Sequence, residues 1–154
     1  MNKLLLGILL TSLFISSCVS QQKQLETTFS VLKGKYWSLN NLIVNNEIFA
    51  TATEEGFDAV PTPFIRFNEN GEIWIKLDET INGKGKFQLN GNTLKITEDK
   101  CTEKCKLSEN CDRMNELFLL FLKKDNIIYE ISESKNQLKL KQGEDIVQFY
   151  HYKQ

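Results

Sequence analysis

Apolar and polar side chains alternate over most of residues 63–97, and turn-forming residues interrupt the alternation. Ile73, Ile75 and Leu77 share one face of an extended segment, and the residues between them share the other. The same period recurs at two later pairs of apolar residues, Phe87 with Leu89 and Leu94 with Ile96. Together with the apolar segment at residues 64–67, this pattern predicts four short strands.

Clusters of asparagine and glycine separate these strands, at residues 68–71, 80–85 and 90–92. Asn and Gly adopt positive φ at low cost, and Asn-Gly is a strong hairpin signal. Parallel strands would need crossovers of about a dozen residues or more, which these short turns do not provide. The stretch therefore predicts an antiparallel meander, with Gly83 and Gly85 as turn glycines.

The segments on either side complete the fold prediction. A first strand is expected at residues 36–39 with Trp37 and Leu39 inward, and closing strands at 127–131, 137–141 and 146–152. Residues 50–63 read as a long loop that could bind a partner. The fold class expected is α+β and mainly antiparallel β: a small curved sheet or partly open barrel with one amphipathic helix packed on it.

That helix is predicted from five apolar residues at helical spacing: Met114, Leu117, Phe118, Phe121 and Leu122. Ser108 is a candidate N-cap, and Lys123 with Lys124 suit the negative end of the helix dipole. Leu119 and Leu120 widen the apolar stripe, so we expect the helix to be well buried.

The N-terminus has the pattern of a targeting segment, with Lys3 followed by an apolar run over residues 4–15. Ile15-Ser16-Ser17-Cys18 resembles the bacterial lipobox, in which the cysteine receives lipid. An ordinary secretory signal and an uncleaved anchor are the alternatives, although the run is short for a span of about 20 residues. We therefore expect a signal peptide at 1–17, a lipidated polar tether at 18–31 and a folded domain at 32–154, at the bacterial envelope and on the outer membrane.

Cleavage before Cys18 removes 17 of 154 residues and leaves 137, enough for one domain with a real core. Losing Lys3 leaves 18 basic against 20 acidic side chains, a net charge of −2. This balance does not indicate a nucleic-acid partner or a polybasic membrane surface. The membrane partner expected is the bilayer that holds the N-terminal lipid.

The order of these segments resembles the META/HslJ domain of bacterial envelope lipoproteins over about residues 32–152. The resemblance implies a mainly antiparallel β domain covered by one helix, no known catalytic machinery, and an ill-defined role in the envelope or its stress responses. The family often has Gly-Cys-Asn where this chain has Thr80-Ile81-Asn82, so a disulfide from that cysteine cannot form here. The matching positions are Leu32, Trp37, Leu39, Pro63 to Phe67, Gly71, Asn82, Gly85, Phe87, Leu94, Thr102, Cys105, Glu116, Leu122, Tyr129, Leu138, Leu140 and Phe149.

Three cysteines, Cys101, Cys105 and Cys111, lie in a polar segment before the predicted helix. In an oxidising compartment a disulfide is the expected state, and the sequence does not choose the pairing. Free thiols and a soft-metal site are the alternatives, but the spacing is unusual for zinc and the lone His151 is far along the chain. We expect neither a metal nor a cofactor.

Other chemistry-bearing residues suggest ordinary structural roles. His151 is expected to be a strand residue, because no nucleophile or partner acid is identifiable for it. Trp74 lies on the face opposite Ile73 and Ile75, and we expect it to be buried as well, with an exposed stacking platform as the alternative.

These observations favour a non-enzymatic lipoprotein that binds or interacts at the envelope. The alternatives are a lipocalin-like carrier, whose barrel would hold an apolar molecule, and an inhibitor-type lipoprotein with a protruding loop. A pocket of several hundred cubic ångströms lined by Phe and Trp would indicate the carrier. No ligand-binding residue can be assigned from the sequence.

Overall fold

The computed structural model of the chain describes residues 29–50, 63–78, 82–98 and 113–152. The chain divides into two units, residues 1–31 and 32–154, and every strand lies in the second. The predicted signal peptide, most of the tether and most of the 50–63 loop lie outside the described residues.

The described part of the second unit contains nine strands and the helix α3. Eight of the nine strands are predicted from the sequence, although β1 and β5 are longer than expected; β2 was not predicted. The strands are β1 Tyr36–Val44, β2 Glu47–Ala50, β3 Phe64–Phe67, β4 Glu72–Lys76, β5 Asn82–Asn90, β6 Thr93–Glu98, β7 Ile127–Ile131, β8 Gln137–Gln142 and β9 Asp145–Tyr152; the helix is α3 Arg113–Leu122.

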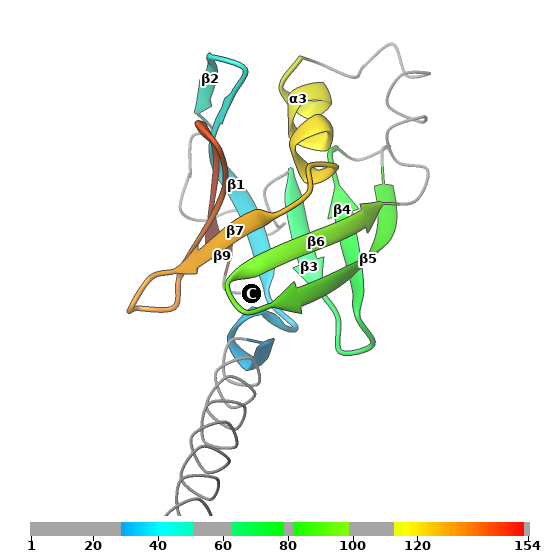
Figure 1. The fold of residues 1–154 in the computed structure, drawn as a ribbon. Helices are drawn as coiled ribbons and strands as arrows, with labels where there is room; N and C mark the ends of the chain where they lie inside the picture. Colours follow the sequence, from blue (N-terminus) through cyan, green and yellow to red (C-terminus); the bar gives the residue numbers. More distant parts are fainter. Residues whose placement is uncertain (1–28, 51–62, 79–81, 99–112, 153–154) are drawn as a thin grey trace, which may run out of the picture. The chain divides into compact units, whose positions relative to one another are not determined.

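The described strands pair as an antiparallel meander from β3 to β9, which confirms that prediction (Figure 1). The sheet does not stay open, because β9 also pairs with β1 along most of its length. Eight strands therefore close into a barrel, and β2 extends β1 beyond the ring. The β1–β9 pairing has a register shift, a β-bulge, between Leu39 and Asn41. β1 also pairs with β3 near its start and with β2 near its end.

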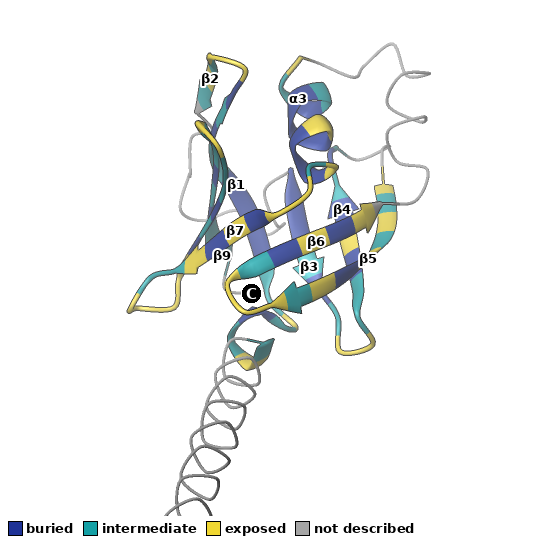
Figure 2. Ribbon diagram, in the orientation of Figure 1, coloured by how far each residue is buried: buried dark blue, intermediate teal, exposed yellow. Residues whose placement is uncertain are grey.

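The barrel interior is filled by the alternating apolar residues of its strands. The register places Trp37 beside Ile65, Ile65 beside Ile75, and Leu39 beside Phe149. Among the described inward residues, Trp37, Ile65 and Phe67 are 0% exposed, so these side chains are packed without accessible space around them. Figure 2 shows the resulting alternation of buried and exposed positions along β6.

The helix lies where the apolar spacing predicts it, at the end of the barrel where the β1–β2 hairpin projects (Figure 1). Leu117, Phe118, Phe121 and Leu122 are buried, and the Phe118 ring centroid lies 5.8 Å from that of Phe149 in β9. Leu119 is buried too, so the helix is covered over more of its circumference than a single stripe. The proposed cap, Ser108, lies outside the described residues.

Two glycines predicted to form a turn belong to a strand. Gly83 and Gly85 lie in β5, in register with the buried Ile75 and Ile73 of β4. Inward positions of a small barrel must fit a limited volume, and glycine also allows a strand to bend. The turn prediction was wrong because glycine signals both turns and strand bends.

Candidate functional site

The outward positions of three neighbouring strands bring aromatic and basic side chains into one row. Arg66 of β3 is in register with Tyr36 on one side and with Trp74 of β4 on the other. Trp74 is in turn in register with Lys84 of β5. Lys76 and Lys86 share this outer surface and lie on opposite sides of the row, because β4 and β5 are antiparallel: Lys76 is in register with Asn82, and Lys86 with Glu72. We call these six residues the Trp74 face.

The Arg66 guanidinium is held between two rings. Its central carbon lies 4.8 Å from the Tyr36 ring centroid and 5.5 Å from that of Trp74, and its Nη1 donates a hydrogen bond of 2.9 Å to the Tyr36 hydroxyl. From the opposite strand, the Lys84 Nζ lies 5.4 Å from the Trp74 centroid. All three cation-to-centroid distances are within the range of cation–π attraction. The indole is thus flanked by cations and remains 38% exposed.

Within the described strands β3–β5, few acidic residues lie beside the four cations of the Trp74 face. Across β3–β5 the outward acidic residue in register with them is Glu72, opposite Lys86. The described ion pairs lie elsewhere on the barrel, and none includes Arg66 or the three lysines. A chain with a formal net charge of −1 therefore carries a local excess of positive charge on this face.

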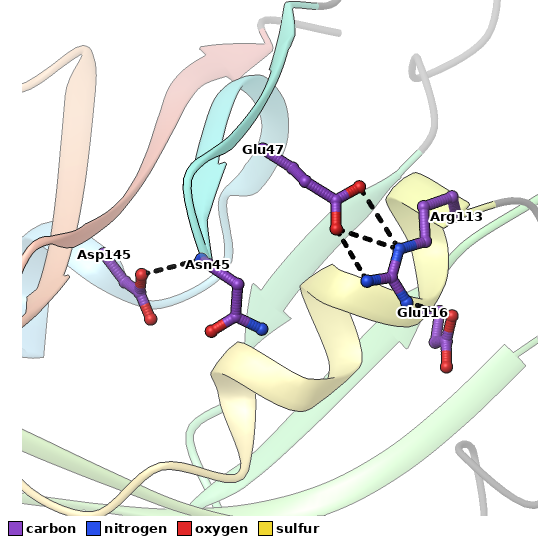
Figure 3. Close-up of polar contacts among 5 residues, drawn as sticks. All are labelled: Asn45, Glu47, Arg113, Glu116 and Asp145. Atoms are coloured by element: carbon purple, nitrogen blue, oxygen red, sulfur yellow. Dashed lines mark hydrogen bonds and ion pairs between the residues drawn. The ribbon is translucent and has the colours of Figure 1, made fainter.

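A second polar cluster joins the β1–β2 hairpin to α3 (Figure 3). Arg113 donates from Nε and Nη2 to the Glu47 carboxylate, with the shortest contact at 2.6 Å, and from Nη1 to Glu116 at 2.7 Å. These contacts engage all three guanidinium nitrogens of Arg113 and both carboxylate oxygens of Glu47. We assign it a structural role, as a clamp between helix and hairpin.

The carboxylates of the clamp region have shifted pKa values. Hydrogen bonds from Arg113 lower the pKa of Glu47. Burial acts to raise the pKa of Asp145, but hydrogen bonds from Lys124 and from the Asn45 amide outweigh it, so the pKa is lowered. Both groups are therefore ionised acceptors near neutral pH, which suits ion pairing and does not suit general acid–base catalysis.

A cavity of about 310 Å³ opens on the outer side of β7, β8 and β9. Its lining includes Glu130, Lys139 and Gln148, which are in register with one another. The lining also includes the apolar residues Ile131, Leu138 and Phe149, so its walls are about equally polar and apolar. Phe149 is the one aromatic residue among the described lining residues, whereas the pocket expected of an apolar carrier is lined by several Phe and Trp side chains.

Some of the residues predicted from the sequence to be functional lie in the described part of the structure, and others do not. His151 lies in β9, as predicted, with its ring centroid 5.9 Å from that of Trp37. The proposed lipidation site Cys18 and the proposed disulfide cysteines Cys101, Cys105 and Cys111 lie outside the described residues. Trp74, expected to be buried, is instead exposed on the outer surface.

The sequence did not reveal the Trp74 face, although a signal for it is present. Composition averages charge over the whole chain, and the acids cancel the lysines. Taking only the outward positions of the predicted strands would have selected Arg66, Trp74 and Lys76. Lys84 would still have been missed, because residues 80–85 read as a turn.

Within the described ranges, no group of three His, Cys, Asp or Glu residues could hold a metal ion. No helix in the same ranges combines the length and apolarity that crossing a bilayer requires. Comparison of the chain with protein-family models, curated proteins and solved structures finds no match.

Proposed function

We propose that this chain is a lipid-anchored, non-enzymatic protein of the bacterial cell envelope, with a META/HslJ-like domain that binds or interacts through its outer surface. Acylated Cys18 holds the protein at the membrane. The barrel is a rigid frame, and its exposed wall presents the binding groups.

The observation that carries this proposal is the filled interior. Side chains from all eight strands of the ring are buried against one another, and α3 covers one end. Eight-stranded barrels can either be filled by their own side chains or hold one small ligand, and this packing corresponds to the filled kind. A filled barrel leaves its outer face for recognition, where the Trp74 face is the clearest concentration of positive charge among the described residues.

The carrier alternative draws support from the closed eight-stranded ring, since lipocalins have the same strand number. It requires an interior cavity, whereas the complete burial of Trp37 and Phe67 among the described residues favours a filled interior. The inhibitor alternative depends on the loop at residues 50–63, most of which lies outside the described residues.

The anchoring step is tested by membrane fractionation of the full chain and of Cys18→Ser, expressed in a bacterium. We expect the native protein in the membrane fraction with an acylated N-terminal cysteine by intact mass, and Cys18→Ser in the soluble or unprocessed state. Cys111→Ser is the matched control and should keep the lipid. An unmodified Cys18 by mass, or unchanged lipid in the variant, refutes the proposal.

The binding step is tested by native mass spectrometry of protein purified from its host. A protein partner or an anionic envelope component retained by the folded chain supports the proposal. An apolar small molecule retained at one per chain would instead support the carrier.

A further inference from the structure

We propose that the Trp74 face seats the folded domain directly on an anionic phospholipid surface. This inference deepens the proposed function and rests on its membrane attachment. It assigns an occupant to the row formed by Tyr36, Arg66, Trp74 and Lys84, with Lys76 and Lys86 beside it.

Charge is the first argument. Among the described residues of β3–β5, the four cations have one acid in register, Glu72, and Asp78 lies two residues beyond Lys76, so positive charge is in local excess. On other walls, Lys95 and Lys141 are paired with Asp125 and Glu130. An anionic leaflet attracts each nearby Lys or Arg by an amount equal to about a fivefold gain in partitioning. The complementary partner is therefore a surface that presents many negative groups at once.

The arrangement of side chains on the Trp74 face favours one kind of anionic partner over others. A stacking platform for nucleic-acid bases presents an aromatic ring face, whereas both neighbours of Trp74 place cations over its indole. The residues also lie on the outer wall of a sheet, where strands are about 4.8 Å apart, so Arg66, Trp74 and Lys84 together span roughly 10 Å. A broad anionic surface suits this geometry better than a single stacked ligand.

An exposed Trp flanked by Arg and Lys is typical of residues at a membrane–water interface. The amphipathic indole lies at the level of the headgroups, and the long basic side chains extend toward the phosphates. Arg66 is already oriented by the Tyr36 hydroxyl, which reduces the freedom lost on binding.

The proposed lipid anchor would hold the folded domain close enough to the bilayer for the Trp74 face to reach it. Residues 19–31 separate Cys18 from the domain, and 13 residues span at most about 45 Å when fully extended. A domain held within this distance meets the leaflet at a high effective concentration, so a weak face can still dock.

The test uses full-length protein reconstituted in vesicles of phosphatidylcholine, with and without phosphatidylglycerol, and lipids that carry a bromine quencher near the headgroup. Trp37 is fully buried, so quenching reports on Trp74. We expect quenching in anionic vesicles, its loss in high salt and in pure phosphatidylcholine, and its absence from Trp74→Phe.

The chain supplies a charge-matched control. Lys84→Glu with Lys86→Glu should abolish the quenching, whereas Lys139→Glu with Lys141→Glu makes the same change at the same spacing on β8 and should leave it intact. Circular dichroism checks that both variants fold. Equal quenching in the two lipids, or equal loss in the two variants, overturns the proposal.

Two further results are informative. If an oligonucleotide or heparin shifts Trp74 emission and anionic vesicles do not, the face binds a soluble polyanion and the proposal is wrong. The lipid anchor is tested independently of the quenching. If Cys18 is not acylated, the intact mass shows this whatever the result of the quenching experiment.

Discussion

Arg113, at the start of α3, donates hydrogen bonds from Nε and Nη2 to the carboxylate of Glu47 in β2, and its Nη2 lies 2.6 Å from Oε1. The two residues are 66 positions apart, and their contact ties the hairpin that extends beyond the barrel to the helix that covers its end. Both side chains are largely exposed, at 50% and 39%, so water screens the pair. Its expected role is to hold a local element in place rather than to stabilise the whole barrel.

Glu47→Gln should therefore loosen the hairpin without unfolding the domain. We expect the amides of β2 and of the first turn of α3 to exchange faster with solvent, while the global unfolding midpoint stays unchanged. Native-state hydrogen exchange measures the first and denaturant unfolding the second. Glu133→Gln, in the exposed turn between β7 and β8, is the control and should change neither. Uniformly faster exchange across all strands would contradict a local role.

The helix provides a prediction with a control on the same element. Phe118 and Leu117 are 0% exposed, so their replacement by Ala should cost about 2–5 kcal/mol of unfolding free energy through lost burial and a residual cavity. Leu120 is 40% exposed, and Leu120→Ala should cost under about 1 kcal/mol. Denaturant unfolding of the three variants measures the difference. Equal costs at Leu117 and Leu120 would show that α3 is not packed against the barrel as described.

Alternation was enough to place most strands and their inward side chains. In an antiparallel sheet a residue's face follows from its parity, so Ile73, Ile75, Leu94 and Ile96 could be assigned to the core before any contact was known. Helical spacing located α3 for the same reason. Both signals are local, and both agree with the structure; the local exception is the glycine-rich segment at 80–85, most of which belongs to β5 rather than to a turn.

Closure of the barrel could not be predicted in the same way. It depends on β1 pairing with β9, for example Leu39 with Phe149, and nothing in either strand alone specifies that distant edge. The exposure of Trp74 was not predicted for a related reason. Its burial depended on whether another element covered that side of β4, which is a property of the assembled fold.

Asp145 makes stability depend on pH. The pKa of its carboxyl is lowered from the ordinary value of 3.8, because hydrogen bonds from Lys124 and from the Asn45 amide outweigh the effect of burial. A carboxyl with a lowered pKa in the folded state contributes stability that is present above the unfolded-state pKa and is lost as pH falls through the folded-state pKa. The native protein should therefore lose stability in acid partly through this residue.

Asp145→Asn removes that contribution. Near neutral pH we expect the variant to be less stable by about 1–3 kcal/mol, since its side chain is only 13% exposed and an ionic hydrogen bond to Lys124 is lost. The gap between the two proteins should narrow as pH falls from about 5 to about 2. Urea unfolding at a series of pH values measures this gap. Glu144→Gln changes the exposed neighbouring carboxylate, and its unfolding free energy should depend on pH in the same way as that of the native protein. A gap that stays constant across the acid range would mean that the Asp145 carboxylate has the same pKa in the folded and unfolded chains.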